Sequence, residues 1–549
     1  MLNIYQKIIQ KCIEEKPKNE KELAKIKRWA AKKFKISPPS NIFLNKVYQE
    51  LLKNKEIKRD KNLEKLFIKR KIRSLSGVAV VSVLTKPYAC PGKCIYCPKE
   101  KGIPKSYLSG EPAVQRAKNL NFDPYLQVQK RIEMLKFQGH PIDKIELRII
   151  GGSFSVYPKS YKIHFVSECF RACNDFPKSK KLSPQKQKAN LQILKKEQKK
   201  NEIAKQRIVG ISVETRPDLI NEKEIILMRN LGVTMVEIGV QTIYDDILKK
   251  CKRGHTTKEI TEATRLLKDA GFKVMYHLMP NLPSSNKKLD EKMFKEVFEN
   301  ENFKPDWLKI YPCVATKEAE IYKLYKQKKW KPYSDKELIN LLKNVKSFLP
   351  YFVRVARIYR DIPSEKIVGG SLISNIREIV KKEMEKQNTA CRCIRCREVK
   401  EEYNPKEKVF LFRQDYNASF GKEIFLSFET KNRKKLYSYL RLRIPSFIYS
   451  HSHTRISRTK SEKPLFGCLK NSAIIREIHT FGKVAPIGKK TTSPQHKGLG
   501  KKLIKEAEKI AKEEFKIKKI AVIAGVGTRK YWKKQGYKLF QTYMVKKLI

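Results

Sequence analysis

The stretch VAVVSVLTKPYACPGKCIYCP, residues 78–98, carries the strongest structural signal in the chain. Its first half is a valine-rich apolar run, which is typical of a buried strand in a parallel sheet. Its second half places Cys90, Cys94 and Cys97 within eight residues. Soft thiolates at this spacing suit an iron–sulfur cluster or zinc. Three cysteines would leave one iron of a cubane cluster open to a small molecule, whereas zinc would need a distant fourth ligand.

Further apolar runs follow the first one and are separated by polar, helix-like segments. They are residues 144–152, 207–214, 234–241, 273–280, 307–312 and 352–358. Repeated strand–helix units indicate an α/β fold with a parallel sheet of six or seven strands, closing as an open or partial barrel. Because chemistry in such folds lies at the carboxyl ends of the strands, the cysteine loop stands where a catalytic cofactor belongs.

Polar residues and glycines also stand at these strand ends, and they are candidate site residues. They are Thr85, Lys86, Gly151, Gly152, Glu214, Arg216, Glu237, Gln241, His277 and Tyr311. For each there is a structural alternative. A charged residue at a strand end is often a buried, paired group, a glycine pair is often an ordinary tight turn, and Lys86 could be a simple surface lysine.

Regions with different patterns flank the barrel. The first 70 residues predict basic helices, since Leu23 and Ile26 recur near helical spacing between lysines, and either a nucleic-acid-binding appendage or a capping subdomain fits them. After residue 406 the apolar runs become antiparallel, and a helix (499–514) and a strand (518–524) follow. The predicted divisions are a basic helical region (1–75), a barrel (76–385), a cysteine-bearing linker (386–405) and a second α/β domain (406–549). The lysine-rich insertion at 177–206 predicts a mobile loop or an exposed helix.

Composition narrows the class of protein. The formal net charge is +65, from 121 Lys plus Arg against 56 Asp plus Glu. This excess favours a polyanionic partner, nucleic acid first, although part of it reflects lysine enrichment along the whole chain. No apolar run reaches the ~20 residues of a membrane helix, and the N-terminus lacks the pattern of a signal peptide. We therefore expect a cytoplasmic protein without a membrane partner.

Twelve cysteines in a reducing compartment favour metal ligands over disulfides. Cys391, Cys393 and Cys396 form a second cluster, which usually means structural zinc with a fourth ligand from elsewhere. His451 and His453 are candidates for that ligand, and a second iron–sulfur cluster is the alternative. We interpret this cluster as a clamp between domains. The remaining cysteines are expected to be small buried hydrophobes: Cys12, Cys169, Cys173, Cys251, Cys313 and Cys468.

A glycine motif in the second domain suggests a coenzyme site. Gln495, Gly498 and Gly500 lead directly into the helix at 499–514. Glycines let the backbone close on a pyrophosphate, and the helix N-terminus offers free N–H groups. The motif follows an antiparallel sheet and precedes a strand, which is the order found in acetyltransferases of the GNAT type. The expected pyrophosphate is that of coenzyme A.

The cysteine loop resembles that of radical S-adenosylmethionine (SAM) enzymes, and longer stretches are similar to the catalytic subunit of Elongator. These stretches are TKPYACPGKCIYCP, PKSYLSGEPAVQRA, DPYLQVQKRIEMLKFQGH, ETRPD, EIGVQT, RGHTTKEI, GFKVMYHLMPNLP, LKIYP, RDIP, CRCIRCREV, LRLRIP and GVGTRKYWKKQGY. They extend over about residues 75–549. The resemblance implies a radical SAM partial barrel joined to a GNAT-type acetyltransferase domain.

The resemblance also implies roles for individual residues. Cys90, Cys94 and Cys97 would hold a [4Fe-4S] cluster, SAM would contact Tyr96, Gly151, Gly152, Glu214 and Gln241, and acetyl-CoA would contact Lys86, Gln495, Lys497, Gly498, Leu499, Gly500, Lys501 and Tyr531. Lys86 and Tyr531 would be catalytic, and the second cysteine cluster would bind zinc. The family has two adjacent tyrosines where this chain has Tyr531 and Trp532, so Tyr531 is the only phenol of that pair.

The implied reaction is the formation of 5-carboxymethyluridine at the wobble position of tRNA. A radical formed from SAM takes hydrogen from the methyl group of acetyl-CoA, the resulting carbon radical adds to C5 of the uridine, and hydrolysis removes CoA. The implied partner is the anticodon stem-loop of tRNA. Other Elongator-type subunits or a homodimer are left open.

Two rival functions fit parts of the pattern. One is a protein lysine acetyltransferase with a structural barrel, for which Glu477 would be the candidate base. The other is a non-catalytic tRNA-binding protein with degenerate sites, against which the intact cysteine triad and glycine motif argue.

Overall fold

The computed structural model describes residues 2–68, 77–177, 190–400, 404, 406–449, 463–482 and 498–548. Some of the residues singled out above lie outside these ranges. They are Gln495 and Lys497 of the glycine motif, His451 and His453, and residues 178–189 of the lysine-rich insertion.

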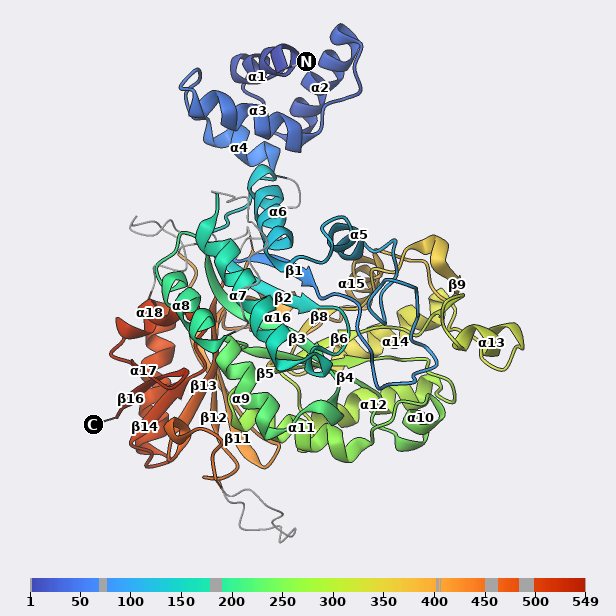
Figure 1. Ribbon diagram of the computed structural model, residues 1–549, viewed down its shortest axis with the longest axis vertical. Helices are drawn as coiled ribbons and strands as arrows, with labels where there is room; N and C mark the ends of the chain where they lie inside the picture. The colour runs from blue at the N-terminus through green and yellow to red at the C-terminus, as the bar shows by residue number, and fades with distance from the viewer. Residues whose placement is uncertain are drawn as a thin grey trace.

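Within the described residues, seven strands form one parallel sheet in the order β1-β2-β3-β4-β5-β6-β8 (Figure 1). They are β1 (Ala79–Leu84), β2 (Lys144–Ile150), β3 (Arg207–Thr215), β4 (Met235–Gln241), β5 (Lys273–Leu278), β6 (Trp307–Ile310) and β8 (Arg354–Arg357). Each corresponds to one of the runs predicted to be a strand. No ladder in the described parts of the chain joins β8 back to β1, so the barrel is open, as predicted.

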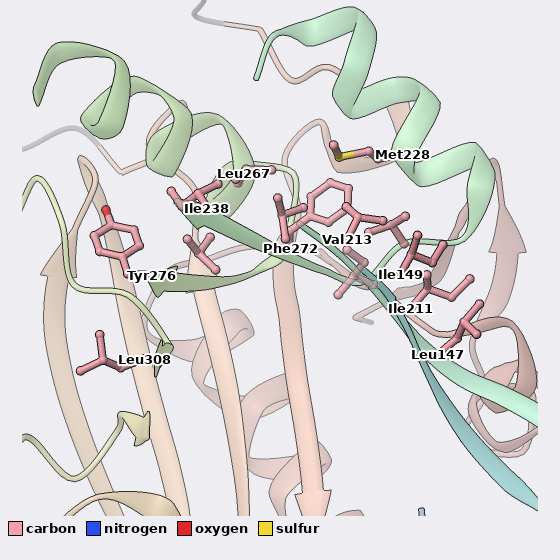
Figure 2. Packing of buried hydrophobic residues seen from close by; sticks show 14 of the residues in the cluster. Leu147, Ile149, Ile211, Val213, Met228, Ile238, Leu267, Phe272, Tyr276 and Leu308 are labelled. Carbon is pink, nitrogen blue, oxygen red and sulfur yellow. The ribbon is translucent and has the colours of Figure 1, made fainter. Parts of the chain in front are cut away.

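Helices connect these strands and cover the outer face of the sheet. They are α5 (Pro112–Lys118), α6 (Pro124–Phe137), α7 (Lys159–Asp175), α8 (Leu191–Asn201), α9 (Glu222–Leu231), α10 (Asp245–Lys250), α11 (Thr257–Asp269), α12 (Lys287–Glu299), α13 (Ile321–Lys326), α14 (Asp335–Phe348), α15 (Ile376–Lys386) and α16 (Ile394–Arg397). Figure 2 shows Met228 of α9 and Leu267 of α11 beside the strand residues Val213 and Ile238, all of them buried. Burying such a side chain contributes roughly 1.5–3 kcal/mol. A small sheet of β7 (Ala315–Thr316) and β9 (Ile367–Gly369) was not predicted.

The lysine-rich insertion is more ordered than predicted where the structure describes it. Residues 191–201 form α8, and the face that carries Leu194 and Asn201 is buried. The side chain of Asn201 accepts a hydrogen bond from the Ile208 amide (2.8 Å) and donates one to the Gln206 carbonyl (3.0 Å). The expectation of a mobile loop or exposed helix is therefore wrong for this half, because its polar side chains find partners at the start of β3.

The C-terminal unit is a second sheet, with the order β10-β11-β12-β13-β14-β16-β15. Its strands are β10 (Phe410–Ala418), β11 (Gly421–Glu429), β12 (Leu436–Ile444), β13 (Ala473–Thr480), β14 (Lys519–Val522), β15 (Lys538–Phe540) and β16 (Tyr543–Lys547). Neighbouring strands are antiparallel except for β13 and β14. In the chain, the helix α17 (Leu499–Glu513) lies between β13 and β14, and the helix α18 (Arg529–Lys533) lies between β14 and β15. The sequence did not predict β15 and β16, which are short.

At the other end of the chain, residues 2–68 form four helices in the part that the structure describes. They are α1 (Leu2–Glu15), α2 (Glu20–Phe34), α3 (Asn41–Lys53) and α4 (Lys61–Phe67). They enclose a small core of their own that includes Leu23, Ile26 and Tyr48. Figure 1 shows this bundle projecting from the rest of the molecule beyond α6. The Asn45 side chain donates to the Phe137 carbonyl (2.7 Å) and so ties α3 to the end of α6.

Buried ion pairs join the two sheets. Asp306, which directly precedes β6, accepts hydrogen bonds from Arg476 of β13 (3.0 Å between Nη1 and Oδ2). Arg443 of β12 donates to Asp269 at the end of α11 (2.9 Å from Nε), and Arg441 donates to the Phe352 carbonyl (2.6 Å). All three arginines are fully buried. Because unpaired buried charges are costly, these pairs hold the sheets in one relative position.

No helix in the described ranges is long and apolar enough to cross a membrane.

The ion pairs between the sheets lead to a stability prediction. We expect Arg476→Ala to lower the free energy of unfolding by roughly 3–5 kcal/mol, because it leaves the Asp306 carboxylate buried without its main partner. Urea denaturation followed by circular dichroism measures the loss. The control is Arg413→Ala, whose side chain is 36% exposed and pairs with Glu514 at the surface. It should cost at most about 1 kcal/mol, and equal losses in the two variants would contradict the prediction.

Candidate active site

The first cysteine loop leaves the carboxyl end of β1 and is held against the later strands. Cys94 is buried, while Cys90 and Cys97 are half-buried. The Ile95 amide donates to the carbonyl of Cys251 (3.2 Å), and the Cys97 amide donates to the carbonyl of Cys94 (3.2 Å). The loop is therefore held in shape by backbone hydrogen bonds within it and to the segment after α10.

Two arginines surround Cys94. Arg253 donates from Nη1 to the Cys94 sulfur (3.3 Å) and from Nη2 to the carbonyl of Gly239 (2.5 Å), and Arg216 donates to the carbonyl of Arg253 (2.7 Å). Burial by itself would raise the pKa of the Cys94 thiol, but the charges of Arg253 and then Arg216 outweigh it and lower the pKa. The site thus favours the thiolate, which is the form that binds metals.

The residues around the loop fit an anionic cluster. The Nη1 atom of Arg216 is buried without a hydrogen-bond partner. A methyl group on Gly92 would lie 2.4 Å from that atom and 3.4 Å from the Cys94 sulfur, so glycine keeps this space open. Among the described residues, the sulfurs of Cys90, Cys94 and Cys97 do not form a group within 4.8 Å of one another. That spread suits a cluster in which each cysteine binds a different iron better than it suits a single ion.

The predicted glycine pair closes the end of β2 against the end of β1. Gly151 has a φ of +128° and Gly152 a φ of +97°. A methyl group on Gly151 would lie 2.2 Å from the Thr85 hydroxyl, so only glycine allows the two strand ends to approach. The backbone therefore requires glycine at Gly151, and the positive φ of both residues favours glycine at the pair.

Charged side chains cross the interior of the barrel at the same end. Glu214 accepts a hydrogen bond from the Tyr107 hydroxyl (2.6 Å) and one from Lys309 (3.3 Å). Lys309 also pairs with Glu237, which hydrogen bonds with His277 Nε2 (3.0 Å). Ligand atoms of Glu214, Glu237 and His277 lie within 4.8 Å of one another, and the Lys309 ammonium already pairs with both carboxylates. Burial and then Lys309 lower the pKa of His277, so its ring is neutral.

The two remaining predicted SAM contacts also lie beside Cys94. Gln241 ends β4 with a φ of +72°, and its carbonyl accepts the Met279 amide (2.8 Å). The Gln241 side chain and Arg253 both lie close to Gly239. A methyl group on Gly239 would be 3.0 Å from Gln241 Nε2 and 2.6 Å from Arg253 Nη2. Tyr96 is close enough to Cys94 to help lower the pKa of its thiol, after the two arginines.

Residues predicted to contact acetyl-CoA come together where β13 and β14 separate. These parallel strands pair only from Ala473 to Ile475 on β13, so the rest of β13 is free on that side. A methyl group on Gly500 would lie 3.5 Å from the Tyr531 hydroxyl and 3.6 Å from the Thr480 hydroxyl. Tyr531 is 40% exposed and therefore accessible from solvent. The ends of the paired segment of β13 and β14, the first turn of α17 and Tyr531 therefore lie close together, as the predicted coenzyme site requires.

The other residues of the motif have distinct surroundings. Gly498 caps α17 with a φ of +68°, which favours glycine. Leu499 is buried and Lys501 is exposed. Trp532 is buried and meets Tyr531 edge-on at 5.5 Å between ring centroids. The tryptophan is therefore a core residue.

Comparisons with known proteins agree with this architecture. Residues 85–296 match the radical SAM superfamily, and residues 305–386 match the radical SAM C-terminal domain. The tRNA uridine(34) acetyltransferase of Methanocaldococcus infernus is 43% identical over 99% of this chain and 98% of its own. Elongator complex protein 3 of Homo sapiens is 37% identical over 87% of this chain and 85% of its own.

The chain belongs to the Elongator complex protein 3 family.

A solved structure of this family supports the fold. The archaeal Methanocaldococcus infernus Elp3 with an N-terminal deletion has a TM-score of 0.70 at 42% identity, and the match covers 86% of this chain and 100% of that chain. The predicted resemblance to Elongator and the predicted radical SAM partial barrel with a following sheet domain are both confirmed.

The second cysteine cluster of this Elongator-family chain is tighter than the first. The sulfurs of Cys391, Cys393 and Cys396 lie within 4.8 Å of one another. Lys346 of α14, itself fully buried, donates to the Cys396 sulfur (3.5 Å). The Ile394 amide donates to the carbonyl of Val353 (2.9 Å), which fastens α16 to the start of β8. In the described part of the chain no fourth His, Cys, Asp or Glu completes this group, and Lys346 is its nearest charged partner.

Sequence reasoning missed some residues and misassigned one. Arg253, Lys309 and Lys346 were not selected, because their importance comes from contacts with distant segments. Glu477, the candidate base of the acetyltransferase alternative, is buried and pairs with Arg441 (2.9 Å). Burial would raise the pKa of Glu477, but Lys273 and then Arg441 lower it to about 2. As a permanently charged, paired group it is a poor base, and it belongs to the contact between the sheets.

The contact between Arg253 and Cys94 leads to a prediction for this Elongator-family chain. We expect Arg253→Leu to retain an iron–sulfur cluster roughly tenfold less well, because the Cys94 sulfur loses its N–H donor and nearest positive charge. Iron and sulfide per chain, measured after anaerobic reconstitution and gel filtration, test it. The matched control is Arg265→Leu, since Arg265 pairs with Glu262 on α11 away from the loop. Equal iron contents would contradict the prediction.

Proposed function

We propose that this chain is a radical SAM and acetyl-CoA dependent enzyme that forms 5-carboxymethyluridine at the wobble position of tRNA. The observation that carries this is the presence of two sites in one rigid chain: a three-cysteine loop at the strand ends of the barrel, and a glycine–tyrosine site where β13 and β14 part. Relatives named tRNA uridine(34) acetyltransferase support the substrate.

In this proposal Cys90, Cys94 and Cys97 hold a [4Fe-4S] cluster. SAM contacts the cluster and the residues at the neighbouring strand ends, which are Tyr96, Gly151, Gly152, Glu214 and Gln241. When bound, the cluster and SAM supply a carbon-centred radical. Residues of the chain do the rest: Gly151 and Gly152 shape the end of β2, and Lys309 pairs with both Glu214 and Glu237 and holds them in place.

The second site holds acetyl-CoA in this proposal. Gly498, Leu499, Gly500 and Lys501 bring the N-terminus of α17 to the pyrophosphate, where free amides and the helix dipole favour an anion. Gln495 and Lys497 precede this turn in the sequence and belong to the same proposed contact. Tyr531 stands beside Gly500 and meets the sulfur end of the coenzyme. Lys86, exposed at the end of β1, is proposed to meet the acetyl group at the mouth of the barrel.

The N-terminal helices are proposed to bind tRNA. Their polar faces are rich in lysine, and the chain carries a formal charge of +65. Contacts of lysine with phosphate release counterions, so binding should weaken with salt. The anticodon stem-loop is the proposed RNA element. We leave the oligomeric state open between a homodimer and an assembly with other Elongator-type subunits.

The second cysteine cluster is proposed to bind zinc as a structural ion. Three close thiolates suit zinc, and the buried ammonium of Lys346 offsets the net negative charge of a three-thiolate site. The cluster lies between α14, β8 and the chain entering the C-terminal sheet, so a bound ion would fasten that junction.

The decisive experiment is an activity assay on protein reconstituted without oxygen. With SAM, a reductant, acetyl-CoA and tRNA, we expect nucleoside mass spectrometry to detect 5-carboxymethyluridine. Cys94→Ala should reduce the product to background, because the loop loses its most buried thiolate. Steady consumption of acetyl-CoA by a fully loaded protein, without any modified uridine, would instead favour acetyl transfer to another acceptor.

Metal analysis tests the zinc proposal separately. We expect one zinc per chain in purified protein and little zinc in Cys393→Ser. Removing one of three thiolate ligands removes most of the affinity of such a site for zinc. Lys346→Met should bind zinc roughly tenfold more weakly, since it removes the charge that balances the thiolates. Lys343→Met, on the same helix with no contact to the cluster in the structure, is the matched control. Iron in place of zinc would support a second iron–sulfur cluster and refute the proposal.

A further inference from the structure

A stack of aromatic rings runs from the core to the surface beside the first cysteine loop. Its inner end is Phe165 of α7, which is fully buried. The ring of Tyr161 lies 5.7 Å from Phe165, that of Tyr157 lies 4.8 Å from Tyr161, and that of Tyr88 lies 4.8 Å from Tyr157, all between centroids. Tyr88 is the outer end, its ring is tilted by 31° to that of Tyr157, and the residue is 43% exposed, so part of the ring is open to solvent.

Hydrogen bonds hold this stack rigid. The Tyr157 hydroxyl hydrogen bonds with the Thr85 hydroxyl (2.9 Å) and donates to the carbonyl of Lys86 (2.6 Å). The Lys86 amide donates to the Tyr161 hydroxyl (3.1 Å). The backbone leading to Tyr88 is thus fixed by the same rings on which Tyr88 rests. A ring held in this way offers a flat surface with little conformational entropy left to lose on binding.

The surroundings of Tyr88 are positively charged and close to the chemistry. Tyr88 stands two residues before Cys90. The exposed lysines of the same loop are Lys86, Lys93, Lys99 and Lys101. The only acidic residue in the sequence from 85 to 102 is Glu100, which is half-buried and accepts the Ser109 amide (3.0 Å). An exposed aromatic ring in a loop that carries exposed lysines is the combination that binds single-stranded nucleic acid.

We propose that the exposed ring of Tyr88 stacks one unpaired nucleobase of the substrate RNA, next to the base that is modified. Lys93, Lys99 and Lys101 contact the phosphates on either side, whereas Lys86 keeps its proposed contact with the acetyl group. Bases that are modified must leave their stack, and the neighbours that they leave need a new partner. Tyr88 supplies that partner at the mouth of the barrel. The inference rests on the proposed function, because it takes RNA as the substrate.

Steady-state kinetics with an anticodon stem-loop RNA test the role of Tyr88. Tyr88→Leu removes the ring, whereas Tyr88→Phe and Tyr88→Trp keep it. We expect the KM for RNA to rise about tenfold in Tyr88→Leu. This value lies in the lower part of the range of effects found when one base–aromatic stack is removed. The ring-keeping variants should stay within about twofold of the wild type on the same argument. The KM for acetyl-CoA and the cleavage of SAM without RNA should not change in any variant.

Controls separate stacking from damage to the loop. Phe540→Leu removes an aromatic ring that is 56% exposed on the C-terminal sheet, and should leave the KM for RNA unchanged. Iron per chain shows whether each variant loads its cluster. If Tyr88→Leu loads less iron, Tyr88→His, which keeps a smaller aromatic ring, replaces it and should show an intermediate KM for RNA.

The outcomes differ for the inference and for the proposed function. An unchanged KM for RNA in Tyr88→Leu overturns the inference, and so does an equal rise in Tyr88→Phe. A rise in the KM for acetyl-CoA alone would assign the ring to the adenine of the coenzyme and also overturn it. If the wild type forms no modified uridine, the proposed function fails. The affinity for the stem-loop, measured by fluorescence anisotropy, still tests the stacking in that case. Tenfold weaker binding by Tyr88→Leu supports the stacking.

Discussion

The ion pair between Asp306 and Arg476 is the constraint on which the arrangement of the molecule depends. Asp306 precedes β6 of the barrel, and its carboxylate also accepts the Val274 amide at the start of β5 (2.9 Å). Arg476 of the second sheet donates hydrogen bonds to this carboxylate and also to the carbonyl of Phe272. A buried carboxylate is stable only with such partners, so neither sheet can shift without exposing or orphaning charge. The two candidate sites therefore belong to one frame with a fixed separation.

The chemistry of the barrel end follows from its topology. Parallel strands bring all their carboxyl ends to one edge, where the cysteine loop, the glycine pair and the Glu214–Lys309–Glu237 row meet. In the described residues no ladder joins β8 to β1, so this edge is an arc and not a closed ring.

Much of the fold was predictable from local patterns, whereas much of the site was not. The parallel strands were visible because each is a nearly continuous apolar run, as in residues 207–214. Short elements such as β15 and the buried face of α8 were missed, because their packing is decided by distant residues. Cysteine and glycine motifs led to both candidate sites, since the spacing of such residues is what a cluster or a pyrophosphate requires. Arg253, Lys309 and Lys346 were invisible in the sequence, because a single arginine or lysine is ordinary until its partner is known.

The arginines around Cys94 have an electrochemical consequence. A hydrogen bond to a ligating sulfur and nearby positive charge both favour the electron-rich form of an iron–sulfur cluster. Arg253 supplies the hydrogen bond and Arg216 a second charge with an unused N–H group. A cluster held in this loop would have a higher reduction potential than one in a neutral pocket, so it would accept an electron from a weaker donor. The protein thereby sets which electron carriers of the cell are strong enough to start its reaction.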